Sequence, residues 1–301
     1  MNLPKRNGQV REQRWRSNVH SKLAGALLVP ISLLAAGPVE KTVETTPAPR
    51  ISLFNPIGHI TVTGWEKSQI RIEFTTASPQ VDVDLDQLPP MGRAEKIHVT
   101  THPLNPQMAT RDQTTDYTLE VPEGSDLEIR NSEGEIKVER IRGDASIDSV
   151  GGKIAVSNVS GHLAVRSIAG DIEVVRSAGR VEANSVNGNL RFVSLAGSQL
   201  RASTTSGKIF YEGDFLPGGN YHFSDYSGDM DILTLPSASF DLSAKTVRGK
   251  VVADPEVSVK PRRRSVSPLY GGNSLFGAHN TGAASVELTS FSGTIRIRRL
   301  Q

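Results

Sequence analysis

Apolar and polar positions alternate over short segments of this chain, and the alternation restarts after regularly spaced glycines. Glycine recurs every nine residues from Gly134 to Gly197, and every second one carries the stronger pattern. That stronger series is Gly134, Gly152, Gly170, Gly188, Gly207, Gly228, Gly249 and Gly293. In all eight copies the residues seven and five places before the glycine, and two and four places after it, are apolar if Ala and Tyr are included. A period of two predicts strands with one buried face.

Each unit of 18 to 21 residues therefore predicts two short strands separated by corners. One unit alone buries almost no surface, so the apolar columns are covered only if successive copies stack as rungs. We predict an all-β fold, a parallel β-helix or β-solenoid with about one unit per rung. Glycine suits the corners because it tolerates positive φ and lets the backbone of the next rung approach closely.

Two further columns support stacking. One place after the glycine the charge changes sign along the series, as in Glu135, Lys153 and Asp171, which favours cross-strand pairing. Three places before the glycine the residues are all polar, and we predict that they bond the corner backbone; the alternative is a row of ligand-binding hydroxyls. They are Asn131, Ser149, Ser167, Ser185, Thr204, Asp225, Thr246 and Ser290.

The repeat also has an early copy, because "ISLFNPIGHITV" from Ile51 to Val62 fits the same offsets. We predict that residues 51–123 contain this first rung followed by an irregular β excursion, which caps one end of the stack. Residues 38–50 are predicted to be a linker, and residues 124–301 the regular solenoid.

An insertion at 254–284 interrupts the last units. It is rich in Pro, Gly and Ser and contains Arg262, Arg263 and Arg264, which predicts a loop. The three arginines are candidate contacts for an anionic polymer or lipid headgroups; the alternative is a solvated run of charge. The last strand, "TIRIRRL", is predicted to be an edge that Arg296 and Arg298 protect from further pairing.

The first 37 residues predict export. Six basic residues precede an apolar run at 23–37, as in a signal peptide. Fifteen residues fall short of a bilayer span, although the long basic region keeps an uncleaved membrane anchor as the alternative. Removal of residues 1–37 takes away six of the 34 basic residues and one of the 32 acidic residues. The remaining 28 basic and 31 acidic residues give a net charge of −3. A nucleic-acid partner is therefore not expected. The chain has no Cys, so its stability cannot depend on disulfides.

The sequence contains few motifs that predict a metal, phosphate or catalytic site. The position after each glycine varies too much for a calcium-binding row, "TTSGKI" lacks the upstream glycine of a phosphate loop, and the seven histidines lack metal spacing. Neither a metal nor a cofactor is predicted. The nearest catalytic candidates are Asp225, Asp229 and Asp231, as in a polysaccharide-cleaving β-helix enzyme. Lys208 and Lys250 are expected beside Asp229 in the ladder, which favours a paired surface acid.

The segments "FNPIGHITVTGW" and "YTLEVPEGSDLEIRNSEGEIKV", with the recurring S-x-x-G-x-I-x-V rungs, resemble the bacterial putative-adhesin family over about residues 51–300. The resemblance implies a repetitive β-solenoid of unknown function in the cell envelope, with no catalytic residues to transfer.

The functional prediction is an exported, non-enzymatic β-solenoid that acts as an adhesive or structural interaction surface of the cell envelope. Its expected partners are an envelope polymer, a glycan or another protein, with membrane contact only if 23–37 is retained. The alternatives are a polysaccharide-active β-helix enzyme and a membrane-anchored envelope-stress accessory protein.

Overall fold

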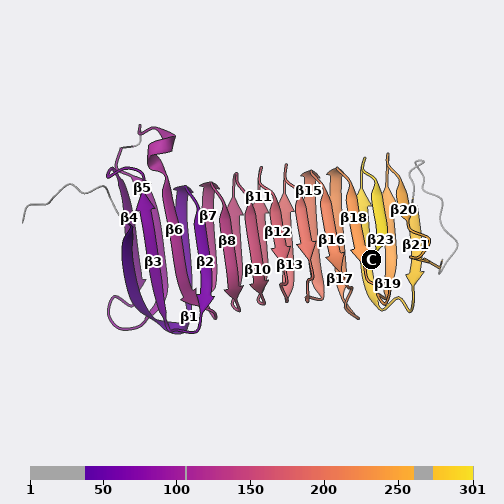
Figure 1. The fold of residues 1–301 in the computed structure, drawn as a ribbon, viewed down its shortest axis with the longest axis horizontal. Coiled ribbons are helices and arrows are strands. Elements are labelled where there is room, and N and C mark those ends of the chain that lie inside the picture. The colour runs from indigo at the N-terminus through magenta and orange to yellow at the C-terminus, as the bar shows by residue number, and fades with distance from the viewer. Residues whose placement is uncertain (1–37, 106, 261–273, 301) are drawn as a thin grey trace, which may run out of the picture. The chain divides into compact units, whose positions relative to one another are not determined.

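Alternating side chains place the chain in two sheets that enclose one apolar core (Figure 1). The structure is a computed structural model that describes residues 38–105, 107–260 and 274–300. Within those ranges the chain forms 23 strands and one 3₁₀ turn, Thr110–Gln113. The predicted arginine contacts at 262–264 and the apolar segment at 23–37 lie outside the described residues.

The two sheets share the long first strand, β1 (Val39–Ile57). In spatial order, sheet A contains the start of β1, β3 (Gln69–Thr76), β6 (Thr115–Pro122), β2 (Ile60–Trp65), β8 (Ile136–Ile141), β10 (Ile154–Val159), β12 (Ile172–Val175), β14 (Leu190–Val193), β16 (Ile209–Gly213), β18 (Met230–Thr234), β23 (Ile295–Arg299) and β20 (Val251–Ala253).

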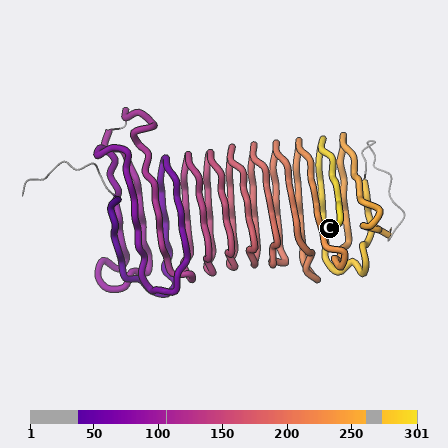
Figure 2. Tube along the Cα trace, viewed as in Figure 1, coloured from indigo at the N-terminus to yellow at the C-terminus, as the bar shows by residue number. Residues whose placement is uncertain are grey.

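Sheet B contains β4 (Val81–Leu88), β5 (Ala94–Pro103), the remainder of β1, β7 (Asp126–Glu133), β9 (Ala145–Ser149), β11 (Leu163–Ser167), β13 (Arg180–Ser185), β15 (Gln199–Ser206), β17 (Asn220–Ser227), β22 (Ala284–Ser290), β19 (Phe240–Thr246) and β21 (Ser274–His279). From β7 to β22 every neighbouring pair in this sheet is parallel. Figure 2 shows the rungs side by side.

The predicted β-solenoid is confirmed. Of the apolar positions in the four sequence columns, all are buried except Val251 and Ala253, which lie in the edge strand β20. Strands are parallel and in register from one rung to the next; for example, Ile154 pairs with Ile172 and Leu163 with Val181. Hydrophobic burial between the sheets and backbone pairing along the stack therefore stabilise the same arrangement.

Glycine is required at the corners mainly because the rungs approach closely there. A methyl group at Gly170 would overlap the carbonyl oxygen of Gly152, and one at Gly188 would overlap that of Gly170. Gly152 itself also has a positive φ, 93°. The expectation of close approach holds along the whole series, whereas positive φ is needed at few of its members.

The N-terminal end differs from the prediction. Residues 38–50 are not a linker, because Val39–Ile57 is one continuous strand that pairs first in sheet A and then in sheet B. The expected β cap is present: β3 and β4 are antiparallel to their neighbours, while β5 and β6 form a rung outside that of β1 and β2. The first repeat of the sequence is therefore an inner rung.

The C-terminal end is rearranged in a corresponding way. The last rung, β22 and β23, lies between the β17–β18 rung and the β19–β20 rung. Figures 1 and 2 show β23 between β18 and β20. The prediction that the last strand is an edge is thus wrong, because β23 is paired on both sides. At this end of the stack β20 is the edge of sheet A and β21 is the edge of sheet B. The insertion at 254–284 is also more than a loop, since β21 pairs antiparallel with β19.

We expect that Gly152→Ala lowers the stability of the stack by roughly 2 to 4 kcal/mol, because the new methyl group meets the Gly134 carbonyl and the backbone has positive φ. Gly151→Ala is the matched control, since its methyl group would lie 3.7 Å from the Ser132 oxygen and should cost below about 1 kcal/mol. Urea unfolding of both variants checks this, and equal midpoints would contradict the close-approach argument.

Candidate interaction surface

An exposed column of mainly apolar side chains follows the corner at which sheet B ends. We call it the corner stripe; in spatial order it contains Val150, Ile168, Val186, Thr205, Tyr226, Phe291 and Val247. Each member comes directly after a buried polar residue, so the alternation of the strand turns it outward. Val150, Ile168 and Val186 are 47%, 50% and 43% exposed. Polar residues also fit this column, as Thr205 shows, so the scaffold itself does not require apolar side chains here.

Backbone hydrogen bonds hold the corner stripe in register. The N–H of Ala169 donates to the Val150 carbonyl and that of Asn187 to the Ile168 carbonyl, both at 2.8 Å. At the other end, Arg248 N–H donates to the Phe291 carbonyl, also at 2.8 Å. The stripe is therefore as regular as the strands, and its side chains repeat at the rung spacing of about 4.8 Å.

A groove of about 470 Å³ lies beside the first part of the stripe. On one side are Val150, Ile168 and Val186. The opposite side is the outward column of sheet B, and buried polar residues lie between the two. That outer column consists of Phe54, Arg130, Asp148, Arg166 and Asn184. Phe54 is 48% exposed at one end, so the groove combines an apolar side with an aromatic terminus.

The buried polar column that follows the rungs is structural, as predicted. Ser149 Oγ donates to the Gly151 carbonyl at 2.8 Å, and Thr204 Oγ1 donates to the Gly188 carbonyl at 3.1 Å. Ser167 Oγ accepts from Gly170 N–H at 2.8 Å. The column thus satisfies the backbone at the tight corners.

Asp225 is the one acid in this column. It is 5% exposed, and neither carboxylate oxygen has a hydrogen-bond partner among the described residues. Burial, the larger cause, and the negative charge of Asp229 together raise its pKa to about 7. The Gly228 N–H and the Ser290 hydroxyl oppose this in part, although neither meets hydrogen-bond geometry.

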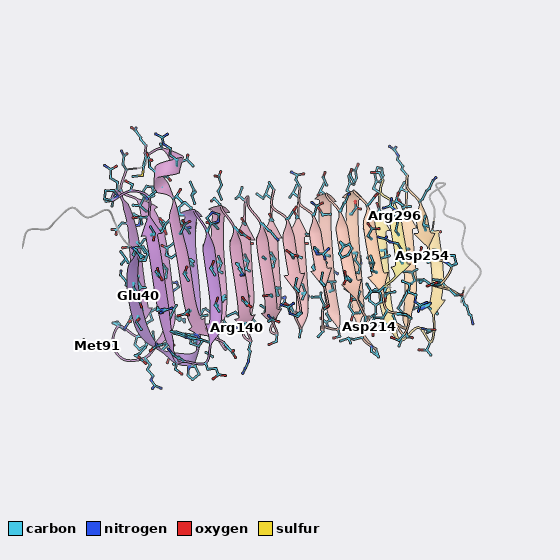
Figure 3. The ribbon with its side chains drawn as sticks, viewed as in Figure 1. Glu40, Met91, Arg140, Asp214, Asp254 and Arg296 are labelled. Carbon is cyan, nitrogen blue, oxygen red and sulfur yellow. The ribbon has the colours of Figure 1, made fainter. Side chains whose placement is uncertain are left out.

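The other two catalytic candidates are held by arginines of the inserted last rung. Asp229 accepts from Thr294 N–H at 2.9 Å and from Arg296 at 2.9 Å, and these contacts lower its pKa. Asp231 lies 3.3 Å from Arg298. Figure 3 shows Arg296 near the C-terminal end of the stack. The prediction that Lys250 lies beside Asp229 is wrong. Lys250 comes directly before β20 and Asp229 directly before β18, and β23 separates these two strands.

The aromatic part of the stripe could not be found from rung order in the sequence. Tyr226 and Phe291 stack with ring centroids 4.7 Å apart and planes 2° apart. The Arg248 guanidinium lies 5.2 Å from the centroid of Phe291. These residues meet because the last rung is inserted. Aligning the residues two places before each glycine would have revealed the exposed column, but not which members are neighbours.

The described residues contain no group of three or more His, Asp or Glu side chains arranged to hold a metal ion. Nor does any helix in the described ranges have the length and apolar character of a membrane span.

A stack of parallel rungs around one core, with its recesses on the outside, defines a repeat-built β-solenoid. Residues 51–298 match the Toastrack DUF4097 family, a family of unknown function, and the chain belongs to it. This confirms the family-level resemblance drawn from the sequence.

Among solved structures, a putative cell adhesion protein from Clostridium sporogenes matches 88% of this chain over 100% of its own. The two are 11% identical with a TM-score of 0.29, a similarity too low to support a functional argument. A search of curated proteins finds no match.

We expect the stability of the protein to fall as pH rises from about 4 to about 7. Asp225 has a higher pKa when folded, about 7, than the unfolded value near 4. The folded chain therefore binds the extra proton in this window, and its stabilising effect is complete below pH 4 and lost above pH 7. For one proton the slope is at most about 1.4 kcal/mol per pH unit.

Asp225→Asn should flatten that slope, because Asn carries no charge and already occupies this column at Asn131. Asp86→Asn, on the exposed face of β4, is the control and should retain the wild-type slope. Urea midpoints at pH 4.5, 6 and 7.5 measure the effect. Identical pH profiles for wild type and Asp225→Asn would contradict the assignment.

Proposed function

We propose that this protein is an exported, non-enzymatic β-solenoid of the bacterial cell envelope, whose outer surface forms adhesive or structural contacts with other envelope components. The observation that carries the proposal is the groove beside the corner stripe. Exposed Val and Ile side chains repeat there at positions where polar residues would fit, and contiguous apolar surface of this kind is typical of interaction sites.

The size of the surface favours repeated weak contacts. Covering one half-exposed aliphatic side chain contributes roughly 1 kcal/mol, whereas association costs at least roughly 4 kcal/mol. Three or four such side chains only offset that cost. Firm attachment then requires several contacts on one polymer or one surface, which raises the effective concentration of the remaining contacts.

The absence of enzymatic activity is part of the proposal. Asp229 and Asp231 are paired with Arg296 and Arg298, and Asp225 is buried, so the three do not form the pair of accessible carboxylates that glycosidic cleavage uses. If a panel of sugar polymers were cleaved by the wild type and left intact by Asp229→Ala and Asp231→Ala, the enzymatic alternative would replace this part of the proposal.

The groove is tested by replacing Val150 and Val186 together with Ser in the full chain. We expect binding to purified envelope fractions to fall at least about fivefold, because about 1 kcal/mol or more of apolar contact is lost, while the unfolding midpoint stays nearly unchanged. Val252→Ser is the matched control, since Val252 is 48% exposed on β20 in the other sheet. Sedimentation with the fractions measures binding. Equal binding by the double variant and the control, or no binding by wild type, would overturn the proposal.

If the protein is exported with removal of its signal peptide, the mature chain begins near residue 38. N-terminal sequencing of protein recovered from a bacterial envelope or periplasmic fraction measures this. An N-terminus that retains 23–37 would favour the membrane-anchored accessory protein, and recovery from the cytoplasm alone would overturn the export proposal.

A further inference from the structure

The corner stripe steps down in height beside Tyr226. Thr205 is short and exposed and stands between Val186 and Tyr226, and the Val186 side chain has the same size as that of Thr205. The longer Tyr226 side chain therefore stands above both, and we call the space over Thr205 at this step the recess. One rung spacing is about 4.8 Å, more than the 3.5 to 4.0 Å at which carbon atoms make van der Waals contact, so one flat or puckered ring can lie against Tyr226 over Thr205.

Tyr226 presents an open aromatic face to this recess. Phe291 stacks on one face of its ring at 4.7 Å, and Phe291 belongs to the rung on the side away from Thr205. The opposite face is thus directed toward Thr205, and Tyr226 remains 56% exposed. Arg248 lies over Phe291 at 5.2 Å, so the platform is supported from behind by packing and by a cation–π contact.

Neutral polar groups border the recess on both sides. The outward column of sheet B supplies one set, and the residues that follow the stripe supply the other. The six residues are Asn184, Ser203 and Ser224, and Asn187, Ser206 and Ser227. The same outward column is charged beside the groove, at Arg130, Asp148 and Arg166. Hydroxyl and amide groups replace these charges in both columns where the aromatic platform stands. The ionisable groups next to them are the buried Asp225 between the two columns, Arg248 behind Phe291, and Arg166 one rung before Asn184.

This combination selects a class of ligand. The faces of a pyranose ring carry C–H bonds that fit against the negative face of an aromatic ring, and its hydroxyls pair with Ser and Asn side chains. A phosphate- or carboxylate-bearing polymer would instead find six uncharged groups and no fixed cation among them. A flat apolar compound would leave the ring of polar groups unpaired.

We propose that the recess at Thr205 binds one sugar unit of a neutral glycan chain, stacked on Tyr226, and that the chain continues along the groove toward Phe54. The inference rests on the proposed function and names the ligand class of the same surface. Five rung spacings, roughly 24 Å, separate Thr205 from the Phe54 rung, so several sugar units contact the protein at once.

The test uses the full chain in affinity electrophoresis with hydroxyethylcellulose as the neutral glycan and polygalacturonate as the anionic one. We expect wild type to be retarded by the neutral glycan and not by the anionic one. Tyr226→Ala should weaken binding about tenfold, which corresponds to the loss of about 1.4 kcal/mol of stacking. Tyr226→Phe retains the ring and should bind within about threefold of wild type.

Thr205→Leu provides an independent variant, because it fills the recess without removing the platform and should weaken binding about fivefold or more. Phe210→Ala is the control: Phe210 is an aromatic residue of sheet A, stacked under Arg191 at 4.4 Å, and its loss should leave binding unchanged. Unfolding midpoints of all variants verify that the fold is intact.

The outcomes separate the two proposals. Retardation of wild type by polygalacturonate alone, or by neither polymer, overturns the glycan inference, as does unchanged binding by both Tyr226→Ala and Thr205→Leu. The proposed function survives each of these results if envelope fractions are still bound in a manner that depends on Val150 and Val186. Failure of wild type to bind any envelope fraction overturns the function even if hydroxyethylcellulose is bound.

Discussion

The close approach of one backbone to the next at the corners is the constraint on which this structure depends. Strands can hydrogen-bond from rung to rung only if the corners stack as tightly as the strands do, and side chains beyond hydrogen would prevent this where Gly170 and Gly188 meet their neighbours. The buried hydroxyls of Ser149 and Thr204 then satisfy the corner carbonyls that tight stacking removes from water. Glycine and hydroxyl columns therefore make the apolar core possible, rather than resulting from it.

Once the corners are fixed, the next outward position becomes independent of the fold. The residues of the corner stripe contribute little to the core, so they can vary between Thr205 and Tyr226 without disturbing the register. Because these positions can vary without disturbing the fold, a repetitive scaffold can carry an interaction surface on them. In this chain the variation is organised, with aliphatic side chains beside charged ones over the groove and an aromatic pair beside neutral ones at the recess.

Much of the fold could be predicted from the sequence, because a period of two and a repeat of 18 to 21 residues specify which side chains are buried and that copies must stack. The order of the terminal rungs could not be predicted. Val251 and Ile295 are equivalent in an alternation pattern, and either satisfies β18 equally well by burial alone. For the same reason the prediction that Lys250 lies beside Asp229 is wrong, and the sequence does not indicate that Tyr226 stacks with Phe291. The prediction of a linker at 38–50 is wrong because Thr and Pro obscure the alternation there, although β1 pairs through most of that length.

The insertion of β22 and β23 has a mechanical consequence. Both strands are hydrogen-bonded on two sides, so a force applied through the segment after β23 loads two ladders in shear instead of peeling a single strand from an edge. Parallel in-register ladders under shear share the load among many hydrogen bonds, whereas peeling breaks them one at a time. The N-terminal end differs, because the start of β1 is an edge segment of sheet A that pairs with β3 alone. Tension on the C-terminal end of β23 thus meets a strand that is held on both sides, whereas tension on the N-terminus meets the edge segment of β1 and peels it first.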